Sequence, residues 1–132
     1  MSQLTLRLIN EAFAIHSLAK NSDIPAQVFK SDIYFIAKTF DEISIVLPQN
    51  IQLNSDDVER DWQALEVVGP LDFTLTGILS NISTVLANEK ISIFAMSTFD
   101  TDYILVKEAK IKAAIEALRA NQYQVLIPST QQ

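Results

Sequence analysis

Three acidic residues and one glycine in the second half of the chain are candidates for binding a charged ligand. Asp72 stands just before an apolar helical pattern, Gly77 lies within it, and Asp100 and Asp102 flank a strand-to-strand turn. The first turn of a helix offers unpaired backbone N–H groups and positive dipole charge, which suit a carboxylate. The three carboxylates could receive an ammonium or a guanidinium. Together they indicate a binding site for a small charged ligand.

Each of these residues also has an ordinary structural interpretation. An Asp just before an apolar helical pattern commonly caps the helix, and Asp in a turn bonds the neighbouring backbone. Gly77 in a helix interior costs about 1 kcal/mol relative to Ala, which favours a packing or ligand reason for its presence. Both interpretations stay open from the sequence alone.

Catalysis and metal binding lack their usual residues in this sequence. His16 is the only histidine, it falls within a predicted strand, and the chain has no cysteine. A Ser-His pair, a thiol nucleophile or a multi-histidine metal site therefore lacks its parts. No spacing resembles a calcium loop or a phosphate-binding glycine loop. We expect no enzymatic activity, no cofactor, no metal and a packing role for His16.

Composition narrows the class of partner. The chain has 132 residues, a formal net charge of −6 and 48% apolar residues, enough for a buried core. An acidic chain without a basic stripe does not suit nucleic acid or an anionic membrane surface. No apolar run approaches the roughly 20 residues that span a bilayer, and the first residues lack the pattern of a secretory signal. We expect a cytoplasmic protein that binds neither nucleic acid nor membrane.

A short pattern occurs twice and suggests duplication. The sequence Thr-Phe-Asp followed by an apolar strand is found at residues 39–46 and again at residues 98–106. A spacing of roughly 60 residues exceeds the usual periods of solenoid repeats, so two small tandem units are favoured. Coincidence stays open, because Thr, Phe and Asp are ordinary residues around a turn.

The first half is predicted to be mainly β-structure. A hairpin is expected from strands at residues 4–9 and 12–18, turning at Asn10 and Glu11. Residues 24–30 are a loop or one to two helical turns, and strands at 33–38 and 42–47 enclose the first Thr-Phe-Asp turn. The acidic stretch at 48–61 is a solvated connector and the expected boundary between the halves.

The second half is predicted to follow the order β-α-β-β-α-β. Strands are expected at residues 62–68, 91–96, 102–106 and 123–127. Apolar spacing predicts a helix from about residue 75 to 88, capped by Asp72 or Thr74, and a second helix at 108–120. This order generates a four-stranded antiparallel sheet with two helices on one face, the ferredoxin-like fold.

The predicted fold class is α+β with two units, residues 1–61 and 62–132. The first unit has only a short helical segment, so it is expected to be degenerate, and a strand shared or exchanged between the units is an open alternative. Exposing the uncovered sheet face would cost about 25 cal/mol per Å² of apolar surface, so a homodimer is expected to cover it.

Two motifs in the second half resemble a known family. Residues 69–73 with 77–79, and then residues 93–106, resemble the ACT domains of the CASTOR family of arginine sensors. The whole chain, including residues 24–26 and 41–46, is similar to small tandem-ACT proteins of bacteria. The similarity covers about residues 4–127. It implies a ferredoxin-like module that binds an amino acid or a similar small molecule at a domain interface.

This resemblance implies a regulatory protein and a set of ligand-binding positions. A ligand-free module for protein interaction or assembly is the alternative function. The implied binding residues are those of the helix start and the second Thr-Phe-Asp turn: Asp72, Phe73, Leu75, Thr76, Gly77, Ile78, Thr98, Phe99, Asp100, Thr101 and Asp102.

Overall fold

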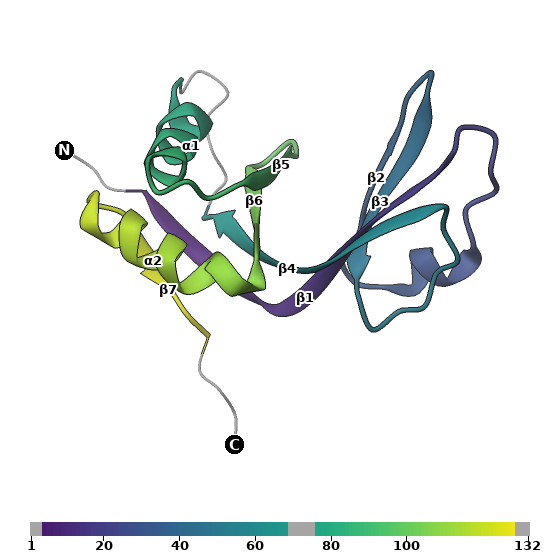
Figure 1. Cartoon of the computed structure of the whole chain (residues 1–132), viewed down its shortest axis with the longest axis horizontal. Helices are drawn as coiled ribbons and strands as arrows, with labels where there is room; N and C mark the ends of the chain where they lie inside the picture. The colour runs from purple at the N-terminus through teal and green to yellow at the C-terminus, as the bar shows by residue number, and fades with distance from the viewer. Residues whose placement is uncertain (1–3, 69–75, 129–132) are drawn as a thin grey trace. The chain divides into compact units, whose positions relative to one another are not determined.

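The structure, a computed structural model, describes residues 4–68 and 76–128 (Figure 1). Its internal contacts form two compact units, one built from the first ten residues with residues 63–132 and one from residues 11–62. Strands β1 (Thr5–Ala19) and β4 (Asp57–Val67) each contribute one part to each unit.

The larger unit is an α+β fold with the strand order β7-β1-β4-β6-β5. Strands β5 (Ile93–Ser97) and β6 (Asp102–Lys107) form an antiparallel hairpin. Its helices are α1 (Ile78–Asn88) and α2 (Ile111–Ala120), the latter preceded by a 3-10 turn (Glu108–Lys110), and β7 is Gln124–Leu126.

Both helices cover the same face of this sheet. The apolar positions of α1 and α2 recur at helical spacing, and alternate residues of β1, β4 and β6 point toward them, as the pleat of a strand requires. Together they form one core of buried side chains: Leu6, Leu65, Val67, Ile82, Leu86, Ile91, Ile104, Val106, Ala114, Ile115, Leu118 and Val125.

The strand and helix order predicted for the second half is confirmed, but the four-stranded sheet is wrong. The first part of β1 lies between β7 and β4. Thr5, Leu6 and Arg7 pair in parallel with Gln124, Val125 and Leu126. The hydrophobic pattern of a strand specifies which face is buried but not which strand lies beside it, so this insertion was not predicted.

The smaller unit contains the rest of β1, the beginning of β4, and strands β2 (Phe35–Lys38) and β3 (Glu42–Pro48). β3 pairs antiparallel with both β2 and β1. A 3-10 helix (Ala26–Lys30) follows Pro25, in agreement with the one to two turns expected there. Its core is Leu18, Val28, Ile43, Ile45 and Leu47.

The hairpin predicted at residues 4–18 is wrong, because β1 is one strand of 15 residues. Asn10 and Glu11 stay extended, since each part of β1 has its own partner: β7 at the start and β3 from Phe13 onward. The predicted connector at 48–61 is also shorter than expected, because β4 begins at Asp57 and its acidic residues belong to a strand. The tandem ACT-like arrangement, the boundary at residue 61 and the exchanged strand stay predictions.

Candidate functional site

A pocket of about 270 Å³ lies in the larger unit, beside the end of β4 and the turn between β5 and β6. Three of its lining residues come from the turn, and the rest come from β1, β4, β6 and the residue that follows β4. The described lining is Arg7, Glu66, Val68, Thr98, Asp100, Thr101 and Tyr103.

The alternation of three neighbouring strands brings the charged lining residues together. Leu6, Leu65 and Ile104 point into the helix-covered core. Successive side chains of a strand point to opposite faces, so Arg7 and Glu66 point away from the helices. Tyr103, which precedes Ile104, does the same. Because β1, β4 and β6 are adjacent in the sheet, a guanidinium, a carboxylate and a phenol meet on the other face.

Glu66 is the centre of this group. Arg7 Nη1 lies 3.4 Å from Glu66 Oε1, and the Tyr103 hydroxyl donates a hydrogen bond of 3.2 Å to Glu66 Oε2. The Arg7 side chain is 51% exposed and that of Glu66 24%. An ion pair this long and this exposed contributes about 0 to 1 kcal/mol, so the Glu66 carboxylate is oriented without being tightly held.

The pKa of Tyr103 is raised by burial and by the negative charges in the pocket. Burial raises this pKa above the usual value of 10.0. The negative charge of Glu66, the hydrogen bond to Glu66 and the charge of Asp100 raise it further, in that order. Two carboxylates therefore act on the same phenol from β4 and from the turn.

The turn that carries Asp100 is held by threonine hydroxyls. Thr98 N donates to Thr101 O at 2.7 Å, and Thr101 N donates to Thr98 Oγ1 at 3.2 Å. The Thr101 hydroxyl donates to the backbone oxygen of Val67, and Thr101 is buried. These bonds attach the turn to the end of β4, which fixes the position of Asp100 beside the pocket.

The first Thr-Phe-Asp sequence adopts the same kind of turn in the smaller unit. Thr39 N donates to Glu42 O at 2.9 Å, and Glu42 N donates to Thr39 Oγ1 at 3.2 Å. The repeated sequence thus encodes a repeated turn, because the hydroxyl of a threonine can cap the backbone two or three residues ahead of it.

The structure brings some of the predicted site residues together and separates others. Thr98, Asp100 and Thr101 line the pocket. Asp102 instead accepts a hydrogen bond of 2.5 Å from Ser97 Oγ, which agrees with its structural interpretation. Phe99 is 80% exposed and is not among the described lining residues.

The helix start is partly described. Gly77 lies just before α1 rather than within it, and its φ of 77° is a left-handed value that glycine adopts without steric cost. Thr76 is exposed, Ile78 is the first residue of α1, and neither is among the described residues of the pocket. Three further predicted site residues lie outside the described residues: Asp72, Phe73 and Leu75.

Sequence reasoning missed Arg7, Glu66, Val68 and Tyr103. A signal was present for Glu66, which interrupts the apolar strand at 62–68 on the face opposite its buried neighbours. Arg7 had the same signal between Leu6 and Leu8. The alternation of apolar and polar residues could not show that β1 and β4 are adjacent in the sheet.

His16 has the packing role expected of it. It is buried, and its Nδ1 lies 2.8 Å from Ser55 Oγ. Burial, followed by the positive charge of Arg60, lowers the pKa of the imidazole. Among residues 4–68 and 76–128, no group of three or more His, Asp or Glu side chains could hold a metal ion.

No helix in the described part of the chain has the length and apolar character needed to cross a membrane.

The chain contains an ACT domain. Residues 57–120 match the family model of the ACT domain. It resembles the cytosolic arginine sensor for mTORC1 subunit 1, with 34% identity over 126 residues to the Homo sapiens protein and 32% over 125 residues to that of Mus musculus. Each alignment covers 87% of this chain and 38% of the sensor, so the chain spans well under half the length of these relatives.

Solved structures show the same fold. A protein of Agrobacterium tumefaciens has a TM-score of 0.88 at 28% identity, and the alignment covers 100% of this chain and 98% of that one. The regulatory subunit of aspartate kinase from Thermus thermophilus has a TM-score of 0.63 at 12% identity, over 87% and 95% of the two chains. The latter likeness shows the fold alone.

Proposed function

We propose that this chain is a regulatory ACT-domain protein that binds an amino acid or a related small ligand and has no catalytic activity. The observation that carries the proposal is the pocket beside the β5–β6 turn. Within the larger unit it offers a guanidinium from Arg7, carboxylates from Glu66 and Asp100, and hydroxyls for hydrogen bonding. A free amino acid presents one carboxylate and one ammonium, which these groups complement.

Arginine is the first ligand to test. The curated relatives are named as arginine sensors, and the described lining of this pocket contains two carboxylates against one guanidinium. A ligand that carries a second positive charge would balance that excess. The shared length is too short for the relatives' specificity to be carried over without a measurement.

The remaining predicted positions belong to the same proposal. The helix start and the exposed part of the turn would complete the site at an interface with a second domain or a second copy, in a cytoplasmic homodimer. These positions are Asp72, Phe73, Leu75, Thr76, Gly77, Ile78, Phe99 and Asp102.

Thermal denaturation with each of the twenty L-amino acids tests the proposal. A ligand at a hundredfold excess over its Kd should stabilise the folded chain by about 2.7 kcal/mol. Asp100→Asn should weaken that effect, because it removes one charge with little change in shape. Glu116→Gln, an equivalent change on the exposed face of α2, should not. If no amino acid raises Tm and calorimetry shows no heat of binding, the proposal is wrong.

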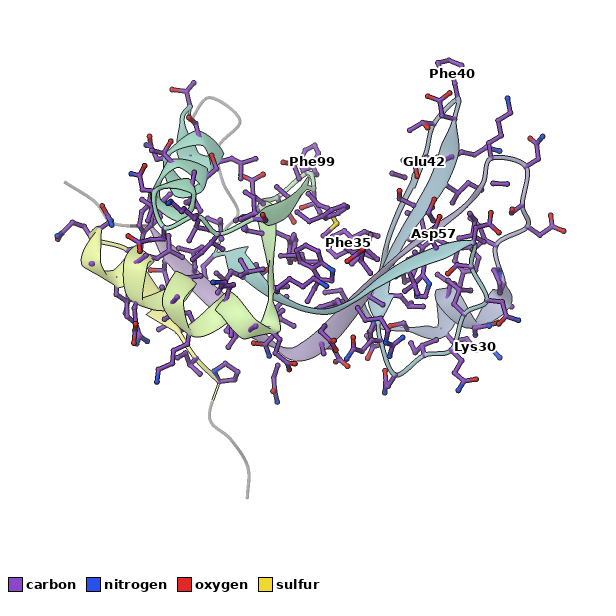
Figure 2. The ribbon with its side chains drawn as sticks, viewed as in Figure 1. Lys30, Phe35, Phe40, Glu42, Asp57 and Phe99 are labelled. Atoms are coloured by element: carbon purple, nitrogen blue, oxygen red, sulfur yellow. The ribbon has the colours of Figure 1, made fainter. Side chains whose placement is uncertain are left out.

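A second function, protein assembly without a ligand, is favoured by two exposed aromatic residues. Phe40 is 92% exposed and Phe99 is 80% exposed, each at the end of a hairpin (Figure 2). Large apolar side chains exposed on turns that hydrogen bonds hold in place are typical of interaction surfaces. This function predicts association that depends on concentration and is lost in Phe40→Ser or Phe99→Ser, as sedimentation would show. Ligand binding should not depend on Phe40.

A further inference from the structure

We propose that Arg7 binds the α-carboxylate of the ligand, while Glu66 and Asp100 receive its α-ammonium. This inference rests on the proposed function and adds the orientation of the ligand and a residue from outside the matched ACT segment. Arg7 lies on β1, whereas the family match covers residues 57–120. The N-terminal strand would thus supply one half of the recognition of the ligand.

Arg7 is the positively charged residue in the described lining of the pocket, and its chemistry suits a carboxylate. The guanidinium is planar and presents paired N–H donors that match the two oxygens of a carboxylate. Its backbone is fixed by pairing with Leu126 on β7, and the neighbouring Leu6 is fully buried. The strand therefore holds the base of the side chain, while the guanidinium, on a side chain that is 51% exposed, can move.

The bond that Arg7 makes in the free protein is weak enough to be replaced. Its nearest contact to Glu66 is 3.4 Å, longer than the roughly 2.7–2.9 Å of a strong charge-assisted hydrogen bond. Only one guanidinium nitrogen of Arg7 is in this contact. A ligand carboxylate that engages two nitrogens would therefore compete well for Arg7.

Releasing Arg7 frees Glu66 for the positive end of the ligand. Glu66 Oε2 stays bonded to the Tyr103 hydroxyl at 3.2 Å, so the carboxylate keeps its orientation. Glu66, Asp100 and Tyr103 all line the same pocket, so both carboxylates face the space that the ligand would occupy. An ammonium with three N–H donors can bond to both carboxylates and to a threonine hydroxyl of the turn.

Pairs of ligands that differ only in the α-carboxylate test this orientation on the full chain. Arginine is compared with agmatine, histidine with histamine and tyrosine with tyramine, using calorimetry on the wild type and on Arg7→Gln. We expect Arg7→Gln to weaken the amino acid at least tenfold and to change the Kd of the matching amine less than threefold. Lys112→Gln, the same loss of charge on the exposed face of α2, should affect neither ligand.

The outcomes separate this inference from the proposed function. If an amino acid binds the wild type and Arg7→Gln binds it equally well, the orientation is wrong and the proposed function stands. If amino acid and amine weaken together, the role of Arg7 in binding the carboxylate is also wrong. If no amino acid binds the wild type, both proposals are wrong. Arg7→Lys, which keeps the charge without the paired donors, should lose affinity by an intermediate amount, and circular dichroism verifies that each variant is folded.

Discussion

The side chain of Gln49 forms a two-point clamp on Asp61. Gln49 Oε1 accepts a hydrogen bond of 2.7 Å from Asp61 N, and Gln49 Nε2 donates one of 3.1 Å to Asp61 Oδ1. Asp61 lies in the middle of β4 with a φ of 67°, which is uncommon for a residue other than glycine. The clamp satisfies the groups that this local departure from strand geometry exposes.

Gln49→Ala should therefore lower the free energy of unfolding by about 1 kcal/mol, since it removes two exposed hydrogen bonds that support an unfavourable backbone angle. Urea denaturation measures the change. Gln52→Ala is the matched control, because the Gln52 side chain is exposed and only its backbone oxygen takes part in a bond, accepting from Gln27. Equal effects of the two substitutions would contradict the clamp.

His16 predicts a loss of stability in acid. Its pKa is lowered in the folded state from 6.5, chiefly by burial and then by the charge of Arg60. The unfolded chain therefore takes up a proton more readily than the folded chain once the pH falls below about 6.5. The contribution of His16 is complete above this pH and is lost as the pH falls toward the lowered value.

Urea unfolding at a series of pH values checks this prediction. His16→Gln cannot titrate near neutral pH, so its stability should fall less steeply than that of the wild type below pH 6.5. Because His16 is the only histidine, the difference between the two curves isolates its effect. Parallel curves would show that the buried imidazole titrates normally.

Tyr103 should ionise at a pH above 10.0, and Glu66→Gln should lower its pKa, because the substitution removes the neighbouring negative charge. The contribution of Tyr103 to stability changes with pH in the opposite direction to that of His16. The folded chain retains the phenolic proton where the unfolded chain loses it, so this contribution disappears as the pH rises above 10.0. Absorbance of tyrosinate measures the ionisation, and Tyr103→Phe identifies its component. An unchanged pKa in Glu66→Gln would contradict the Tyr103–Glu66 bond.

Thr101→Val should destabilise the larger unit by about 1 to 3 kcal/mol. It keeps the shape of the side chain but removes the buried hydroxyl that donates to the backbone oxygen of Val67. Thr101→Ser retains the donor and should lose less, and thermal denaturation compares the two. If Thr101→Val were as stable as the wild type, the hydrogen bond from Thr101 to Val67 would contribute nothing to stability.

The sequence predicted the positions of the helices and strands better than it predicted which strands pair with each other. The helices α1 and α2 and the strand β3 were predicted, because the periodicity of apolar side chains is local information. The continuous β1 was not foreseen, since Asn10 and Glu11 read as a turn when the partners β3 and β7 are unknown. Pairing between distant strands depends on the whole chain and leaves little trace in either segment.

The residues of the candidate site also divide into those that the sequence predicted and those that it missed. Thr98, Asp100 and Thr101 were predicted because they belong to one short turn, whose chemistry is visible in sequence. Arg7 and Glu66 were missed because they are 59 positions apart and meet only through the adjacency of β1 and β4. Asp102, predicted as a ligand contact, lies at the start of β6 and accepts a hydrogen bond from Ser97 at the end of β5.

The place of β1 beside β7 has a consequence for synthesis on the ribosome. The side-chain bond between Thr5 and Gln124 joins residues that are 119 positions apart, whereas the smaller unit ends at Trp62. At about 5–20 residues per second, the start of β1 waits roughly 3 to 12 seconds after the smaller unit is complete before β7 is made. During that time the edge of β1 that will pair with β7 is unpaired, and strands of other nascent chains could pair with it. The larger unit is therefore the part of this protein whose production depends most on shielding the emerging chain.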